Sequence, residues 1–263
     1  MDFLLLMGGF IVNELEFYQK IKNWDFSKIK YETENFTNWD MYEELKSISN
    51  KDSKILDLGT GGGEKVLNYF PECKEILGTD FSSEMIATAN DNLKRSGKSN
   101  IHFRVMDNLH MDTKDNYFDV VVARHTCIDA KQIYSTLKEG GKLILRGVDK
   151  LDCWSLKRMF NKGQAYKDVK PISVIDYENI MDAGFKEVEL IPLHVKEYFK
   201  SKDDLLALLL KTPILEDFSE IDDNKDLGNE IIDETILDKY IKENTFEKGI
   251  LLIRRYYGIV AVK

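Results

Sequence analysis

A series of glycines behind an acidic residue is the stretch whose spacing best predicts chemistry. Asp57 lies two residues before Gly59, and Gly61 and Gly63 follow at alternate positions. Glycine has no Cβ, so the backbone of such a turn can approach a ligand closely. A dinucleotide site requires Gly-x-Gly-x-x-Gly, but this spacing fails from Gly59 and from Gly61, and the carboxylate of Glu64 would repel phosphate. The pattern favours a ligand with a cationic end and no phosphate, although a glycine turn without any ligand would look the same.

A second acid lies at the distance expected for contact with a ribose. Asp80 ends the apolar run 75–79 and follows Gly59 by 21 residues. Rossmann-like folds place an acid about 20 residues after the first glycine, where its carboxylate accepts from the ribose hydroxyls. A helix start, Ser82-Ser83-Glu84, follows directly. Asp80 could therefore instead be only an acid that precedes a helix.

These two segments resemble the first two motifs of class I S-adenosylmethionine (SAM)-dependent methyltransferases. The resemblance implies a ligand with an ammonium, a carboxylate and a sulfonium. It implies SAM as the cofactor and S-adenosylhomocysteine as its product. The cofactor contacts that it implies in these segments are Asp57, Gly59, Thr60, Gly61, Gly63, Asp80, Phe81 and Met85.

The resemblance continues at the ends of the next two predicted strands. The family has an acid after its third strand whose carboxylate meets the adenine amino group, and Asp107 matches it after the run 101–106. Asn108 would offer a backbone N–H to the ring, although the pair would also suit a simple turn. Arg124 and His125 follow the predicted fourth strand, 117–123. Open α/β sheets bind ligands beyond the carboxyl ends of their strands, so both should face the methyl group.

His125 is the candidate catalytic base, because the ordinary pKa of histidine allows proton acceptance near neutral pH. A histidine that only holds its loop fits the sequence equally well. Arg124 is expected to bind the cofactor carboxylate or an acidic acceptor. Together with His125, Tyr31 and Trp39 of the aromatic segment 13–50 are candidate substrate contacts, although such rings could simply cover the sheet.

Several motifs of other enzyme classes are absent from the sequence, and their absence limits the reactions and acceptors to be considered. Methyl transfer from a sulfonium needs mainly orientation and exclusion of water, and neither a metal site nor a Ser-His-Asp triad is predicted. The segment 124–127 lacks the Asp/Asn-Pro-Pro-Tyr/Phe motif of nucleobase amino-methyltransferases and the Pro-Cys of cytosine C5 enzymes. We expect a small-molecule acceptor methylated on O, N or C. An RNA or protein methyltransferase and a non-catalytic SAM-binding regulatory module remain the alternatives.

Composition indicates a soluble globular protein. The 263 residues are 43% hydrophobic and 32% charged, and the net charge of −9 argues against a nucleic-acid surface. Three separated cysteines indicate a reducing cytoplasm. The oily segment 1–12 is too short to span a membrane. It could be a packed helix, an oligomer contact, a membrane-surface anchor or the result of a start placed too early. A monomer or homodimer is expected.

The elements that must position these residues predict an α/β fold. We expect a Rossmann-like, seven-stranded, mostly parallel sheet of order 3-2-1-4-5-7-6, sandwiched by helices and carrying helical lid elements. Residues 1–50 would form an N-terminal helical or lid segment. Residues 51–263 would form the SAM-binding domain, with a helical insertion at about 200–245. The predicted strands are 54–58, 75–80, 101–106, 117–123, 142–148, 185–191 and, antiparallel, 256–262.

Overall fold

The computed structural model of the chain describes residues 28–216 and 232–263. The oily segment 1–12 and most of the acidic stretch 216–226 lie outside these residues. The elements in chain order are β1 (Tyr31–Asn35), α2 (Met41–Ile48), β2 (Lys54–Leu58), α3 (Glu64–Tyr69), β3 (Glu75–Asp80), α4 (Ser83–Ser96), β4 (Ile101–Val105), β5 (Phe118–Arg124), α5 (Ala130–Thr136), β6 (Leu137–Val148), α6 (Trp154–Phe160), α7 (Ile172–Asp182), β7 (Lys186–Phe199), α8 (Lys202–Lys211), η1 (Pro213–Leu215), α9 (Glu234–Asn244), β8 (Thr245–Phe246) and β9 (Gly249–Val262).

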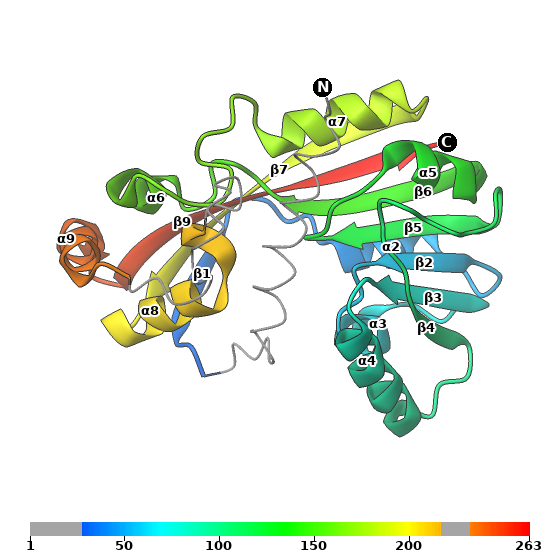
Figure 1. Ribbon diagram of the computed structural model, residues 1–263, viewed down its shortest axis with the longest axis horizontal. Coiled ribbons are helices and arrows are strands. Elements are labelled where there is room, and N and C mark those ends of the chain that lie inside the picture. The colour runs from blue at the N-terminus through cyan, green and yellow to red at the C-terminus, as the bar shows by residue number, and fades with distance from the viewer. Residues whose placement is uncertain (1–27, 217–231) are drawn as a thin grey trace. The chain divides into compact units, whose positions relative to one another are not determined.

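The strands form a mixed, mostly parallel sheet of the expected class (Figure 1). Its path is β1-β7-β9-β6-β5-β2-β3-β4, and β8 pairs with β9. The pairs among β2 to β6 are parallel, whereas β9 runs antiparallel to β6. The predicted α/β fold is therefore confirmed, and the predicted strand order is contained in the path from β7 to β4. The predicted count of seven strands was wrong, because β1 adds beside β7 and β8 pairs with β9.

The described residues group into two compact units. The parallel-strand unit comprises residues 37–149, 172–193 and 256–263. The second unit comprises, among described residues, 28–36, 150–171 and 194–255. β1 is a strand in a segment for which the sequence predicts helical structure, and α2 packs within the parallel-strand unit. The assignment of lid and insertion roles to residues 1–50 and 200–245 stays a prediction.

Two apolar clusters cover opposite faces of the parallel strands. Residues of a strand alternate between the faces of its sheet, so Ile55 and Leu56 on β2 enter different clusters. The face of Leu56 packs against α5 and α7 through Ile133 and Ile180. The face of Ile55 packs against α2, α3 and α4; its helical members include Met41, Leu45, Val66, Ile86 and Ala89. Helices α2, α3 and α4 therefore lie on the same face of the parallel strands.

Several element boundaries differ from those predicted; β9, for example, begins at Gly249 and not at residue 256. The fifth strand was expected from Lys142, but α5 ends at Thr136 and β6 begins at Leu137. Leu137 is fully buried and pairs with Phe118 across a register shift in β5. Burial and pairing thus override the local helical pattern. β7 also continues past the predicted 185–191, because β1 pairs with its second half.

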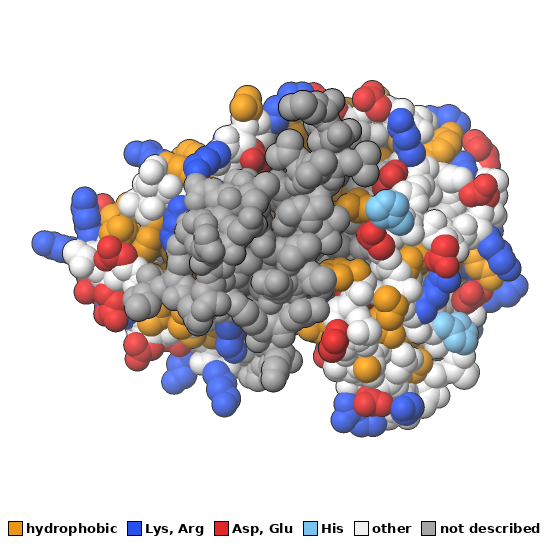
Figure 2. All heavy atoms as spheres, viewed as in Figure 1, with side chains coloured by type: hydrophobic (Ala, Val, Ile, Leu, Met, Phe, Trp, Pro, Cys, Tyr) orange, Lys and Arg blue, Asp and Glu red, His pale blue; other side chains and the backbone are white. Residues whose placement is uncertain are grey.

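Charges of both signs are scattered over the described surface visible in Figure 2, where lysine and arginine side chains alternate with aspartate and glutamate. On the described part of this one face, the distribution differs from the broad basic face that nucleic-acid binding usually requires. Within residues 28–216 and 232–263, no helix is both long enough and apolar enough to cross a membrane.

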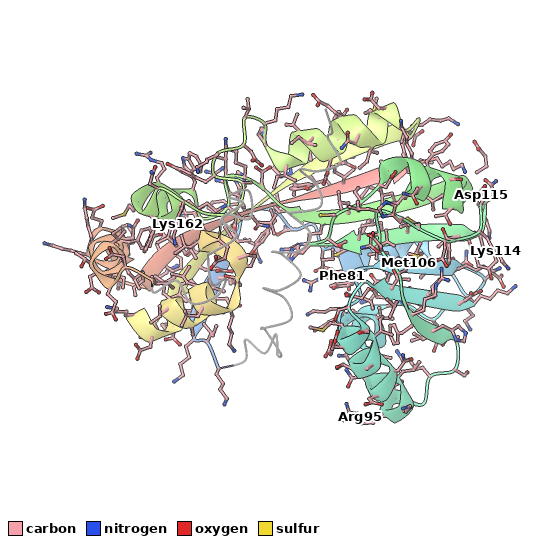
Figure 3. The ribbon with its side chains drawn as sticks, in the orientation of Figure 1. Phe81, Arg95, Met106, Lys114, Asp115 and Lys162 are labelled. Atoms are coloured by element: carbon pink, nitrogen blue, oxygen red, sulfur yellow. The ribbon has the colours of Figure 1, made fainter. Side chains whose placement is uncertain are left out.

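Because the strands are parallel, their carboxyl ends lie at one edge of the parallel-strand unit and their amino ends at the other. Phe81 follows the carboxyl end of β3, whereas Lys114 and Asp115 precede β5 and lie at the opposite edge (Figure 3). Ligands of open α/β sheets bind at the carboxyl edge. The predicted cofactor residues should therefore gather on the side of Phe81.

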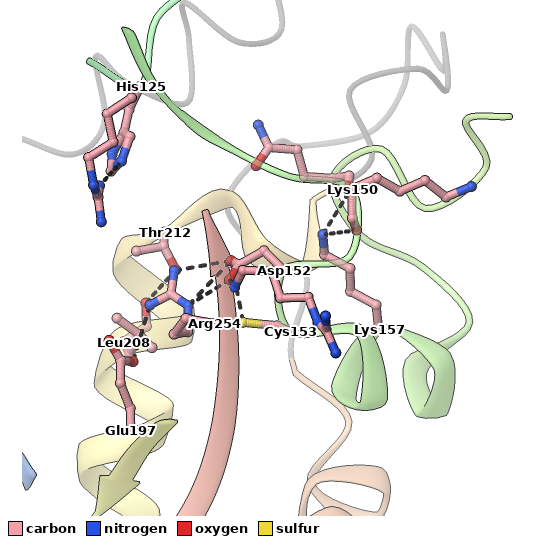
Figure 4. Close-up of polar contacts among 12 residues, drawn as sticks. His125, Lys150, Asp152, Cys153, Lys157, Glu197, Leu208, Thr212 and Arg254 are labelled. Atoms are coloured by element: carbon pink, nitrogen blue, oxygen red, sulfur yellow. Dashed lines mark hydrogen bonds and ion pairs between the residues drawn. The ribbon is translucent and has the colours of Figure 1, made fainter. Parts of the chain in front are cut away.

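A buried ion network lies in the second unit (Figure 4). The Arg254 guanidinium donates to Asp152, with Nε 3.0 Å from Oδ1, and to Glu197, with Nη1 3.2 Å from Oε2. The backbone N–H of Arg255 also donates to Asp152, at 2.8 Å. Asp152 is 1% exposed, so its charge depends on these donors for the interactions that water would otherwise supply.

We predict that Asp152→Ala lowers the free energy of unfolding by about 3–5 kcal/mol, because it leaves the buried Arg254 charge without its main partner. Asp91→Ala is the control: it removes an exposed ion pair with Lys94 and should change the stability little, because exposed ion pairs contribute little. Urea unfolding of both variants measures the difference. Equal losses would show that the network contributes no more than a surface pair.

Candidate functional site

The glycine turn after β2 depends on left-handed backbone at alternate glycines. Gly59, Gly61 and Gly63 have φ values of 73°, 55° and 77°, which residues with a Cβ adopt only with strain. A Cβ on Gly63 would lie 2.7 Å from Cζ of Phe103, so this glycine allows close packing. A Cβ on Gly61 would meet no atom within 4 Å. The turn therefore presents open space at Gly61, where a ligand can approach the backbone.

Asp80 joins this turn to the end of β3. Its Oδ2 accepts from the Gly61 N–H at 2.9 Å, and its Oδ1 accepts from the Ser82 N–H at 3.0 Å. The N–H groups of Gly59 and Thr60 both donate to the Thr79 carbonyl at 2.8 Å. Burial raises the pKa of Asp80, and the two backbone donors oppose that rise. Each carboxylate oxygen can accept a further hydrogen bond, as contact with a ribose would require.

Asp57 lies buried at the end of β2, beneath the turn. Burial raises the pKa of its carboxyl to about 7, and the nearby Thr60 side chain and the positive charge of Arg124 act in the opposite direction. Asp57 pairs with Val122 on β5, and Arg124 lies two residues after Val122. Because side chains two residues apart on a strand point to the same face, Asp57 and Arg124 share one face of the sheet. Thr60 Oγ1 is buried without a partner of hydrogen-bond geometry among the described residues.

Asp107 and Asn108 follow β4 as predicted, and they differ in environment. Asp107 is partly exposed; its Oδ1 accepts from the Leu109 N–H at 2.9 Å, and its Oδ2 lies 2.7 Å from Nδ1 of His110. Asn108 is buried, and its Nδ2 donates to Thr126 Oγ1 at 2.9 Å. Its Oδ1 has no partner within the described part of the chain. Asn108 thus connects β4 to the loop after β5 and offers one unused acceptor.

Phe81 and Met85 lie beside Asp80, at the start of α4. The Phe81 side chain is 43% exposed, although it is a large apolar ring that directly follows β3. Met85 is half-buried, and its backbone N–H donates to the N-cap Ser82 at 3.2 Å. An exposed ring and a thioether next to the ribose acid form a surface on which an adenine could lie.

The loop after β5 brings His125 to Arg146 and Tyr256. Nη1 of Arg146 contacts Nε2 of His125, and Cζ of Arg146 lies 4.2 Å from the centroid of the Tyr256 ring. The rings of His125 and Tyr256 stack at 5.7 Å with an interplanar angle of 11°. His125 has a positive φ of 53° and is exposed; Figure 4 draws it with a polar contact. Because a guanidinium only donates, Nε2 is the accepting nitrogen of His125.

The two predicted aromatic substrate contacts lie in different units. Tyr31 belongs to β1 in the second unit, where it stacks on Phe199 at 5.3 Å. Trp39 belongs to the parallel-strand unit and packs so closely on Gly258 that a Cβ there would lie 2.8 Å from its ring. The Trp39 indole N–H is buried without a partner among the described residues. The substrate roles of both residues stay predictions.

Three residues of this neighbourhood were not predicted from the sequence: Tyr42, Lys65 and Arg146. Burial raises the pKa of Tyr42 on α2, and Arg124, Asp57 and Arg146 all act on it electrostatically. Burial also lowers the pKa of Lys65 in the first turn of α3, and Arg124 and Arg146 lower it further. Arg146 itself pairs with Arg124 across β5 and β6. The carboxyl-edge rule could have identified Arg146, whereas no local pattern marks Tyr42 or Lys65.

A mostly parallel sheet of this order, with a glycine turn tied to an acid on the neighbouring strand tip, defines the class: this is a class I SAM-dependent methyltransferase fold. The chain belongs to the family described as methyltransferase domain, whose sequence model matches residues 49–187.

The named relatives align with only part of this chain. It is 24% identical over 99 residues to the uncharacterized methyltransferase YcgJ of Bacillus subtilis, covering 35% of this chain and 39% of that protein. It is 25% identical over 199 residues to an arsenite methyltransferase of Halobacterium salinarum, covering 69% and 45%. The chain thus spans less than half the length of these relatives.

Solved structures show the same fold over most of the chain. The crystal structure of YcgJ has a TM-score of 0.53 at 16% identity, covering 85% of this chain and 97% of that one. A functionally unknown protein from Deinococcus radiodurans has a TM-score of 0.57 at 9% identity, covering 94% and 98%. At these identities the similarity concerns the fold alone.

Gly61→Ala and Gly63→Ala form a matched pair, because both place a Cβ on left-handed backbone. The strain should cost each variant about 1–2 kcal/mol of stability. Gly63→Ala should lose about 1–3 kcal/mol of stability beyond this, because its added Cβ meets the Phe103 ring. The added Cβ of Gly61→Ala meets no protein atom, so this variant should show no such extra loss but a lower affinity for S-adenosylhomocysteine. Urea unfolding and calorimetry test this; equal stability losses, or full affinity in Gly61→Ala, would contradict it.

The raised pKa of Asp57 predicts a pH-dependent stability. The folded protein holds this proton up to a pKa of about 7, against an ordinary value of 3.8. The contribution of Asp57 to the free energy of unfolding is therefore fully present below pH 3.8. It is lost as the pH rises toward 7, by at most about 1.4 kcal/mol per pH unit. Asp57→Asn cannot titrate, so its stability relative to wild type should increase over this range and then level off. Unfolding measured from pH 4 to 8 tests the sign, with Asp91→Asn as the exposed control.

Proposed function

We propose that the protein is a SAM-dependent methyltransferase that acts on a small-molecule acceptor. The main support for a SAM site is the position of Asp80, the acid expected to contact the ribose. Its carboxylate accepts hydrogen bonds from the backbone N–H groups of Gly61 and Ser82, so this acid lies directly beside the glycine turn. The scattered surface charges and the net charge of −9 favour a small molecule over RNA.

The described residues fit this cofactor. A Cβ on Gly61 would meet no atom within 4 Å, and Asn108 Oδ1 is buried without a partner among the described residues; both features suit a polar ligand that reaches the backbone. Asp57 would hold the ammonium, since a bound cation favours the ionised form of a buried carboxyl. Asp80 would hold the ribose, and Arg124 the carboxylate. Phe81, Met85, Asp107 and Asn108 would bind the adenine, while Gly59, Thr60, Gly61 and Gly63 would form the turn around the methionine part.

The bound cofactor would supply a methyl group activated on a sulfonium, which the lone pair of an acceptor takes by in-line displacement as the C–S electron pair passes to sulfur. The protein mainly has to orient the acceptor and exclude water. Nε2 of His125 already accepts from Arg146, so a base role at this nitrogen requires that contact to open.

Asp80→Ala should weaken binding of S-adenosylhomocysteine by roughly 1.5–3 kcal/mol, the value of hydrogen bonds to a charged group. Calorimetry with the wild type, this variant and Asp115→Ala at the opposite edge provides the measurement. Wild type and Asp115→Ala should bind alike. Unchanged affinity of Asp80→Ala would remove the ribose assignment, and a preference of the wild type for NAD would overturn the proposed function.

A further inference from the structure

Thr126 connects the ends of three strands at the carboxyl edge of the parallel-strand unit. It belongs to the loop after β5, whose first residue, His125, donates its backbone N–H to the Arg146 carbonyl at 2.9 Å. The Oγ1 atom of Thr126 accepts from Nδ2 of Asn108, which follows β4, at 2.9 Å. Its side chain also packs on Gly59 after β2, where an added Cβ would lie 2.9 Å from Cβ of Thr126. One side chain therefore contacts both the glycine turn and the segment after β4.

Asn108 is a buried amide whose hydrogen bonds the protein satisfies only in part. The residue is 7% exposed, and its Nδ2 donates to Thr126. The other amide atom, Oδ1, is buried without a partner among the described residues. A buried acceptor without a donor is unfavourable, and such atoms in native proteins usually meet a water or a ligand. Asn108 thus has one acceptor that an N–H group of a ligand would satisfy.

Asn108 directly follows Asp107, the acid for which we propose contact with the adenine. Just before them, the backbone N–H of Met106 donates to the Asp80 carbonyl at 2.9 Å, which holds the end of β4 beside the acid proposed to bind the ribose. The hydrogen bond from Asn108 to Thr126 holds the next part of the segment. An exocyclic amino group has two hydrogens to donate, so two acceptors in adjacent residues, Asp107 and Asn108, match it.

We propose that Thr126 is a positioning residue for the adenine part of the cofactor site and that it acts through Asn108. This inference rests on the proposed function and adds a residue that makes the site selective for a 6-aminopurine. The Thr126 hydroxyl holds the Asn108 amide so that Oδ1 accepts from the exocyclic amino group, with Asp107 as the other acceptor. Threonine suits this role, because its branched Cβ restricts rotation of the side chain. Its Cγ2 and Oγ1 both lie 3.1 Å from the place of a Cβ on Gly59.

The test uses calorimetry on the full chain with S-adenosylhomocysteine and with S-inosylhomocysteine, which carries an oxygen in place of the amino group. The wild type should prefer the adenosine compound by at least about tenfold, because a site built around a donor rejects an analogue that lacks it. Thr126→Val keeps the branched shape but removes the hydroxyl. It should weaken binding of S-adenosylhomocysteine by about threefold to tenfold, the value of one hydrogen bond, and lower the preference by a similar factor.

Three further variants separate this role from a purely structural one. Thr126→Ser keeps the hydroxyl and should keep the preference. Thr136→Val removes a fully buried hydroxyl that donates to the Lys114 carbonyl at 2.8 Å, at the opposite edge of the strands; it should lower stability but leave both affinities unchanged. Asn108→Leu should lower the preference by at least the same factor as Thr126→Val, which keeps the test valid if the valine variant misfolds. Adding Thr126→Val to Asn108→Leu should lower the preference no further, because the hydroxyl acts through Asn108.

Three outcomes would overturn the inference and leave the proposed function intact. The first is a wild type that binds S-inosylhomocysteine as tightly as S-adenosylhomocysteine, or more tightly. The second is an unchanged preference in Thr126→Val, including a parallel loss of affinity for both compounds, which would make the hydroxyl merely structural. The third is a further fall in preference when Thr126→Val is added to Asn108→Leu. Failure of the wild type to bind S-adenosylhomocysteine at all would instead defeat the proposed function itself.

Discussion

The Asp80 carboxylate is the interaction on which the candidate site depends. One oxygen accepts from Gly61 in the turn after β2, and the other accepts from Ser82 at the start of α4. The same carboxylate thus determines where the glycine turn lies and where the next helix begins. Because these donors come from backbone, side-chain motion cannot disrupt them easily. The cost is a partly desolvated acid whose pKa is raised, and a ligand that donates to the carboxylate would offset that cost.

The two faces of the parallel strands divide structural and chemical roles. The face packed by α5 and α7 is apolar, and its members on β2 and β5 are Leu56, Leu58, Val121 and Ala123. The other face is apolar toward the amino ends of its strands and becomes ionisable at their carboxyl ends, through Asp57, Arg124 and Arg146. α2 covers this face and brings Tyr42 into the same electrostatic neighbourhood. The positive charge of Arg124 acts on the carboxyl of Asp57 and favours its ionised form.

Much of the fold could be predicted from local patterns. The runs 54–58, 75–80 and 101–106 became β2, β3 and β4 with at most one residue of difference, because short apolar runs bounded by glycine or polar turns are typical of buried parallel strands. The start of α4 at Ser82 and its end at Gly97 also followed local capping rules, which act within a few residues. The early start of β6 and the strand β1 could not be predicted in this way. Both depend on pairing with strands distant in the sequence, Phe118 for Leu137 and β7 for β1.

By itself the sequence determined the strand–glycine turn–helix unit and the spacing between Gly59 and Asp80, because these follow from backbone freedom at glycine and from the length of one βαβ step. Only the tertiary structure decided which side chains join that unit. Tyr256 reaches His125 and Arg146 because β9 runs antiparallel to β6, and this register brings Val148 opposite Tyr256. Likewise, the pairing of Arg124 with Arg146 follows from strand alignment rather than from any local pattern. Electrostatic interactions act through space, so their partners are known only when the strands are aligned.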